Sequence, residues 1–187
     1  MSFFKKIQER IIPIQTSSNT ALFQPNENIK HEFVNFSNAY RIGIICYFSD
    51  YSSQEIISNY QKQLEKLGYD CEVLIFIDKK EREHNVYLQS FSWDDLDKKS
   101  SLPYSPRTDR FIVKRYDILL NLYLNNCPQL QFISYMSYAR CRVGAYIEHF
   151  KHCSDVLIPM DNEVSIEGLI QRINTTLNIK PYERKKI

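Results

Sequence analysis

The chain has 187 residues, of which 43% are hydrophobic and 25% are charged, a composition typical of one globular domain with a full core. Its net charge of +2 is too small to indicate nucleic-acid binding, and it contains no apolar stretch of about 18 residues that could cross a membrane. The five cysteines form neither a C-x-x-C pair nor a disulfide framework. We therefore expect reduced thiols, a cytoplasmic protein, no nucleic-acid partner and no transmembrane segment.

The beginning of the chain predicts a helix with one basic side and one apolar side. Residues 3–12 place phenylalanine and isoleucine at helical spacing with lysine and arginine opposite, and Pro13 ends the pattern. We expect a basic amphipathic helix over residues 1–12, which either packs on the body of the protein or lies weakly on a membrane surface. Residues 13–32 are rich in Gln, Ser, Thr and Asn and predict a surface linker.

The first predicted strand is a nearly continuous apolar run over residues 42–48. Such runs are typical of strands buried on both faces of a parallel sheet. The run gives way to polar residues at Asp50, and Ser52-x-x-Glu55 predicts a capping box at the start of a helix. Residues 71–77 predict the second strand. This strand, helix and strand with short connections predict a parallel pair with a right-handed crossover.

The second half of the chain predicts three further strands. They cover residues 116–122, 141–144 and 155–160, and a helix over residues 164–177 follows the last of them. Residues 91–93 indicate a short strand or a loop.

Together these elements predict a single doubly wound α/β domain over residues 33–179. We expect a mostly parallel sheet of about five strands in a flavodoxin- or Rossmann-like order, 2-1-3-4-5. The N-terminal helix is an extension of this domain, and residues 180–187 form a basic tail.

Polar side chains gather where the predicted strands end. In open α/β sheets, ligands bind beyond the carboxyl ends of the strands, where the strand order reverses. Asp50 and Asn121 end the first and third strands, which flank this point. Aspartate and asparagine are also common helix caps and turn residues, so a purely structural role is the alternative. The ligand-binding candidates are Asp50, Ser52, Asp78, Asn121 and Asn125.

The sequence lacks the motifs of several common kinds of functional site. The chain has only four glycines and none at residues 49–53, so we expect no phosphate-binding loop and no NAD, FAD or ATP cofactor. His149-x-x-His152-Cys153 is half a zinc site without the other ligands, and we expect no metal. Cys127, at a helix start, is where a thiolate would be stabilised, but no histidine partner is assigned to it.

Four segments carry a resemblance to a known family: NFSNAYRIGII, FSWDDLDKKSSLPYS, DRFIVKRYDILLNLYLNN and YMSYARCRVGAY. Over residues 33–179 the chain resembles a family of short bacterial proteins known only as a domain of unknown function. The resemblance implies a cytosolic α/β domain behind a basic N-terminal helix and assigns no activity or catalytic residues.

A shorter resemblance, through YDILLNL and Arg142-Val143-Gly144, is to the acceptor-side domain of bacterial heptosyltransferases. Those enzymes need a second domain for the nucleotide sugar, for which we expect no room in this chain.

Two functions remain open from the sequence. The first is a non-catalytic cytoplasmic module that binds a partner protein or a small ligand. The missing phosphate-binding and nucleophile motifs and the aromatic content of 13% favour it. The alternative is a transferase-like enzyme that uses the polar residues at the carboxyl ends of the strands.

Overall fold

The computed structural model describes residues 29–48, 50–78, 88–148, 151–160 and 165–183. The helix predicted over residues 1–12, most of the predicted linker and the last residues of the basic tail lie outside the described residues. His149, half of the motif that resembles a zinc site, lies outside them as well.

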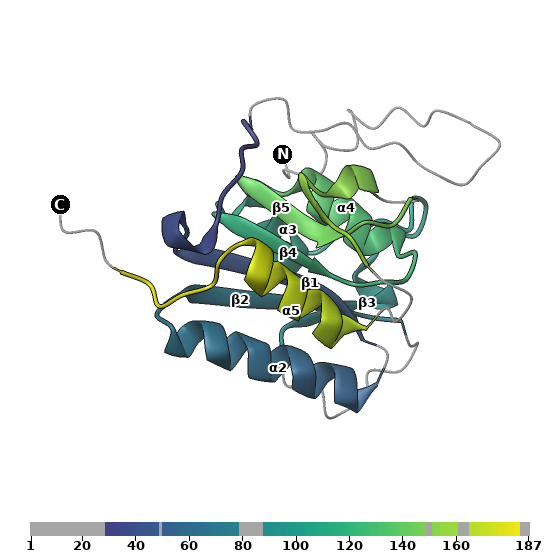
Figure 1. Ribbon diagram of the computed structural model, residues 1–187. Helices are drawn as coiled ribbons and strands as arrows, with labels where there is room; N and C mark the ends of the chain where they lie inside the picture. Colours follow the sequence, from purple (N-terminus) through teal and green to yellow (C-terminus); the bar gives the residue numbers. More distant parts are fainter. Residues whose placement is uncertain (1–28, 49, 79–87, 149–150, 161–164, 184–187) are drawn as a thin grey trace.

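A parallel sheet of six strands forms the centre of the described chain (Figure 1). Its order is β3-β2-β1-β4-β5-β6, which confirms the predicted α/β fold and the order of the five expected strands. The additional strand is β3, which falls where the sequence predicted a short strand or a loop. The strands are β1 (Arg41–Phe48), β2 (Asp70–Ile77), β3 (Ser90–Ser92), β4 (Ile118–Leu122), β5 (Cys141–Ala145) and β6 (Val156–Ile158).

Helices cover both faces of this sheet. Helices α2 (Tyr51–Lys66) and α5 (Ile166–Thr176) lie on one face, and α3 (Pro106–Val113) and α4 (Pro128–Met136) lie on the other (Figure 1). The short 3-10 helices are η1 (Phe36–Asn38), η2 (Trp93–Asp95) and η3 (Lys151–Cys153). Within the described part of the chain, no helix is long and apolar enough to span a bilayer.

Strand β1 shows how a parallel strand is buried from both sides. Ile44 packs with the core residues beneath α2 and α5, whereas the next residue, Ile45, packs with those beneath α3 and α4. Successive side chains of a strand point to opposite faces, so a strand covered on both faces needs apolar residues at every position. This explains why β1 appears in the sequence as a continuous apolar run.

Helix α2 begins at a different cap from the one predicted. The backbone N–H of Ser53 donates to Asp50 Oδ1 at 2.7 Å, so Asp50 is the cap and the predicted capping box from Ser52 to Glu55 is wrong. Asp50 has an extended backbone (φ −165°, ψ 175°), and its carboxylate reaches an amide of the first turn. Ser52 already lies inside that first turn and so is not the cap residue.

Candidate functional site

A hollow of about 320 Å³ lies at the carboxyl ends of β1 and β4, the strands between which the strand order reverses. Ligands bind at this place in open α/β sheets, and the volume falls near the lower end of the range of about 300–1,000 Å³ for small-molecule sites. In Figure 1 the strands run from left to right, so this edge of the sheet lies on the right. The described lining residues with polar side chains are Tyr47, Asp50, Ser52, Ser53, Tyr123, Asn125, Ser165 and Glu167.

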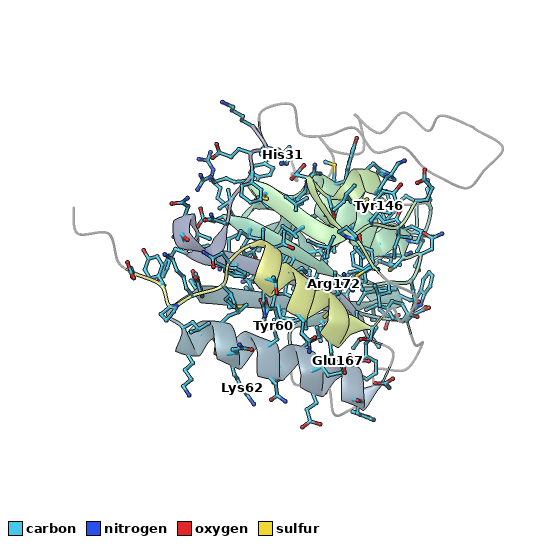
Figure 2. The ribbon with its side chains drawn as sticks, viewed as in Figure 1. His31, Tyr60, Lys62, Tyr146, Glu167 and Arg172 are labelled. Atoms are coloured by element: carbon cyan, nitrogen blue, oxygen red, sulfur yellow. The ribbon has the colours of Figure 1, made fainter. Side chains whose placement is uncertain are left out.

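The starts of two helices form opposite sides of this hollow. Asp50 caps α2, and Ser165 caps α5 by accepting the backbone N–H of Gly168 at 3.0 Å. The two helices are joined further along, because the Tyr60 hydroxyl donates to Asn174 Oδ1 at 2.6 Å (Tyr60 and Glu167 are labelled in Figure 2). The lining residues at both helix starts are therefore held on elements that are fixed to each other.

The charge of the hollow comes from carboxylates. Asp50 and Glu167 are the acidic residues among its described lining residues, which include no lysine, arginine or histidine. Each helix start contributes a partial charge of about +0.5, which only partly offsets them. The hollow therefore suits a neutral or cationic ligand and repels a phosphate.

Asp78 accepts hydrogen bonds from two side chains near the carboxyl ends of the strands, including Tyr47, which packs with the core residues beneath α3 and α4. The Tyr47 hydroxyl donates to Asp78 Oδ2 at 2.8 Å, and Trp93 Nε1 donates to Asp78 Oδ1 at 2.5 Å. Burial, with the hydrogen bond to Asp78 second, raises the pKa of Tyr47 to about 12. Tyr47 is therefore a neutral phenol held in one orientation by Asp78.

Asn121 lies on the other face of the sheet from α2 and α5. It is buried in β4, where its Nδ2 donates to the carbonyl of Cys153 at 3.2 Å and to Ser154 Oγ at 2.8 Å. Gly144 leaves space for it, since a Cβ there would come within 3.0 Å of the Asn121 Cβ. Asn121 thus connects β4 to the segment before β6.

The structure brings three of the five predicted residues together. Asp50, Ser52 and Asn125 line the same hollow. Asp78 lies outside the lining and positions Tyr47, and Asn121 is buried away from the hollow. Their roles in ligand binding remain predictions.

Of the polar lining residues that were not predicted, Ser165 and Glu167 are the most distant from Asp50 in the sequence. They come from the last described helix, more than a hundred residues after Asp50 in the sequence. A sequence signal for them existed, because a helix that follows a parallel strand must begin at the carboxyl edge.

Comparison with known families gives one match that covers most of the chain. The model of a family described as "Family of unknown function (DUF6913)" matches residues 14–179. The chain belongs to this family. The match confirms the resemblance to a domain of unknown function and begins earlier than the predicted residue 33. A comparison with curated proteins finds no match.

The cysteines of this DUF6913 chain are thiols rather than thiolates. Burial raises the pKa of Cys71, Cys127 and Cys153 to about 12 each, and it raises that of Cys46 further still. For Cys127, burial outweighs two backbone hydrogen bonds at the start of α4 that act in the opposite direction. Among the residues that the structure describes, no group of three or more His, Cys, Asp or Glu side chains could hold a metal ion.

Exposed aromatic side chains surround the carboxyl edge. Tyr51 begins α2, Trp93 follows β3, Tyr104 precedes α3 and Tyr146 follows β5. Each is between 44% and 51% exposed, although residues of this size are usually more buried. Figure 2 shows Tyr146 and Glu167 toward the same side of the molecule. These aromatic side chains offer flat apolar surface around a polar hollow.

Proposed function

We propose that this DUF6913 member is a cytoplasmic binding protein that holds a small hydroxyl- or amine-bearing molecule at the carboxyl edge of its sheet. The observation that carries the proposal is the lining of the 320 Å³ hollow, which combines hydroxyls, an amide and two carboxylates. Hydroxyl and amide groups can donate hydrogen bonds to alcohols and accept them from alcohols and amines, and carboxylates can accept them. The five free cysteines support a reducing compartment.

The positions of the polar groups favour binding without large rearrangement. Ser52 and Ser53 belong to the first turn of α2, and Glu167 belongs to the first turn of α5. Groups held on helices that pack on the same sheet lose little freedom when a ligand binds. The hollow therefore has the preorganisation that a small-ligand site needs.

The protonation and hydrogen bonding of the candidate catalytic groups favour binding over catalysis. Covalent catalysis needs a nucleophile activated by a base within hydrogen-bond reach. The Tyr47 phenol is neutral, the Cys127 thiol is buried with a raised pKa, and the Asp50 carboxylate accepts an amide of its own helix. These arrangements favour stable hydrogen bonding over proton or group transfer.

A transferase-like function is the second candidate, and one observation favours it. Asp50 and Glu167 place two carboxylates on one hollow, where either could accept a proton from an acceptor hydroxyl. Turnover of an activated sugar or acyl donor, lost in Glu167→Gln with the fold intact, would support this candidate.

A protein partner at the same edge is the alternative that the exposed aromatic side chains favour. Tyrosine and tryptophan are enriched at the centres of protein interfaces. If a partner is captured and Trp93→Ala abolishes the capture while Asn125→Ala leaves it unchanged, the edge binds a protein surface rather than a small molecule.

The test is calorimetric titration of the full chain with glucose, glucosamine and ribitol as probes. We expect at least one probe to bind saturably, with glucosamine bound more tightly than glucose because two carboxylates line the hollow. Glu167→Gln should remove this preference, and Asn125→Ala should weaken binding of both sugars by about tenfold, the usual effect of one lost hydrogen bond.

Glu183→Gln is the matched control, since it removes an exposed carboxylate outside the hollow. It should leave the affinities unchanged. If no probe binds, or if Glu167→Gln and Glu183→Gln act alike, the small-ligand proposal for this edge is wrong.

A further inference from the structure

A second hollow, of about 530 Å³, lies at the opposite edge of the sheet. Arg41 begins β1, Asp117 precedes β4 and Arg140 precedes β5, so this hollow lies at the amino ends of neighbouring strands. Among the residues that the structure describes, its lining contains four basic side chains, Lys30, Arg41, Arg115 and Arg140, and one carboxylate, that of Asp117.

The carboxylate of Asp117 already accepts three hydrogen bonds within the fold. Asp117 Oδ2 accepts the backbone N–H groups of Tyr40 at 2.9 Å and of Arg41 at 3.0 Å, and Oδ1 accepts Arg140 Nη1 at 2.8 Å. Asp117 therefore connects the starts of three neighbouring strands, and little of its acceptor capacity remains for the other cations.

The basic side chains differ in how far their charge is neutralised. Arg140 also donates to Glu32 at 2.6 Å, and Arg41 lies 3.7 Å from a carboxylate oxygen of Asp70. Lys30 and Arg115 form no ion pair with any residue that the structure describes, and both are exposed. Neither cation has a described carboxylate within ion-pair distance, although Arg140, which pairs with Glu32, lowers the pKa of that carboxylate with help from Lys30.

An aromatic ring is held at the same hollow. Tyr40 is 45% exposed, and its ring centroid lies 4.9 Å from that of Tyr182. Tyr182 is fixed in turn, because its backbone N–H donates to the carbonyl of Leu67 at 2.7 Å. The Tyr40 ring therefore presents an ordered apolar surface beside the cations.

We propose that the amino-edge hollow binds a small molecule that carries a phosphate monoester and a ring. A phosphate monoester has a charge of about −1.5 to −2 at neutral pH, which matches the two unpaired cations better than a carboxylate does. A volume of about 530 Å³ exceeds what a bare phosphate fills, and the Tyr40 ring offers a surface for the rest of the molecule. This site is independent of the proposed function at the carboxyl edge.

The probes are phenyl phosphate, inorganic phosphate, benzoate and phenol, titrated calorimetrically into the full chain. Phenyl phosphate should bind most tightly, and phenol should not bind. Arg115→Gln should weaken binding of phenyl phosphate at least about tenfold, since it removes a charge-assisted contact. Tyr40→Ala should abolish the preference for phenyl phosphate over inorganic phosphate.

Both Arg115 and Lys30 are exposed and without ion pairs in the described chain, so Arg115→Gln and Lys30→Gln should fold normally. Lys62→Gln is the matched control, because Lys62 is exposed on α2 away from this lining (Figure 2). It should leave the affinity for phenyl phosphate unchanged.

Three outcomes would overturn the proposal. The first is the absence of saturable binding of phenyl phosphate at millimolar concentration. The second is equal binding of benzoate and phenyl phosphate. The third is binding only to single-stranded RNA or to anionic lipid vesicles, weakened by Arg115→Gln, which would assign these cations to a macromolecular surface.

Discussion

The two edges of the sheet carry opposite charge, although they belong to the same strands. The carboxyl-edge hollow is lined by Asp50 and Glu167 and by no basic side chain among its described residues, whereas the amino-edge hollow has four basic side chains and one carboxylate. Helices begin at the carboxyl edge, where caps favour aspartate and serine, and end at the amino edge, where the helix dipole favours cations. Helix caps and helix dipoles therefore favour acidic residues at one end of the strands of a parallel α/β sheet and basic residues at the other.

The difference between the edges also shows which charges the fold needs. Asp50 and Asp117 are both hydrogen-bonded to backbone amides, so each stabilises the structure. Glu167, Lys30 and Arg115 have no such hydrogen bond among the described residues. We infer that the charges of the second group are not needed by the fold and are available to ligands, whereas Asp50 serves the fold and also contributes negative charge to its hollow.

Of the predicted changes, we expect the largest loss of stability for Asp117→Ala at the amino edge. The substitution leaves two backbone amides and Arg140 Nη1 without their acceptor, while the rest of the Arg140 guanidinium stays paired with Glu32, and it should lower the free energy of unfolding by about 2–4 kcal/mol. Urea denaturation measures the change. Asp70→Ala is the control at the same edge, because its ion pair with Arg41 is exposed and 3.7 Å long, and it should cost less than about 1 kcal/mol. Equal losses in both variants would contradict the assigned role of Asp117.

A smaller effect is expected for Asp50→Ala at the carboxyl edge. Loss of the helix cap should lower the free energy of unfolding by about 1 kcal/mol. Asp50→Ser keeps a capping oxygen and removes the charge, so its stability should stay within a few tenths of that of the wild type while its preference for glucosamine over glucose falls. If Asp50→Ser retains the full preference for glucosamine, the carboxylate of Asp50 plays no part in ligand selection.

The smallest effect concerns the ionisation of Tyr47. Because its pKa is raised to about 12 in the folded protein, Tyr47 stabilises the fold below its ordinary pKa of about 10, and this contribution is lost as the pH rises toward 12. Asp78→Asn should lower the pKa of Tyr47 only in part, since burial is the larger cause. The difference in phenolate absorbance between each protein and its Tyr47→Phe counterpart measures this pKa. An unchanged value in Asp78→Asn would exclude the electrostatic role of Asp78.

The fold was largely predictable because burial on both faces leaves a simple signal. Strands β1 and β4 appear as continuous apolar runs, and their positions at the centre of the sheet followed from short connections. β3 was harder to predict, because three residues at the end of a sheet give too short a pattern. The cap of α2 was misplaced because Asp50 and Ser52 are both good capping residues, and only the backbone shows which is extended.

The candidate site was less predictable because it depends on which way each side chain points. Asn121 ends a central strand as expected, yet the alternation along β4 turns it toward Cys153 and Ser154, away from α2 and α5. No local sequence motif indicates the amino-edge hollow, because its basic residues lie far apart in the sequence: Lys30, Arg41, Arg115 and Arg140. Only the strand register brings these cations together.

Site-resolved titration of backbone amides by nuclear magnetic resonance tests the central claim, that the two edges select ligands of opposite charge. The full chain would be titrated with glucosamine and, separately, with phenyl phosphate. We expect glucosamine to shift the amides of Ser52, Ser53 and Glu167, and phenyl phosphate to shift those of Lys30, Tyr40 and Arg115. Shifts by both ligands at one edge, or by neither ligand at either edge, would contradict the account.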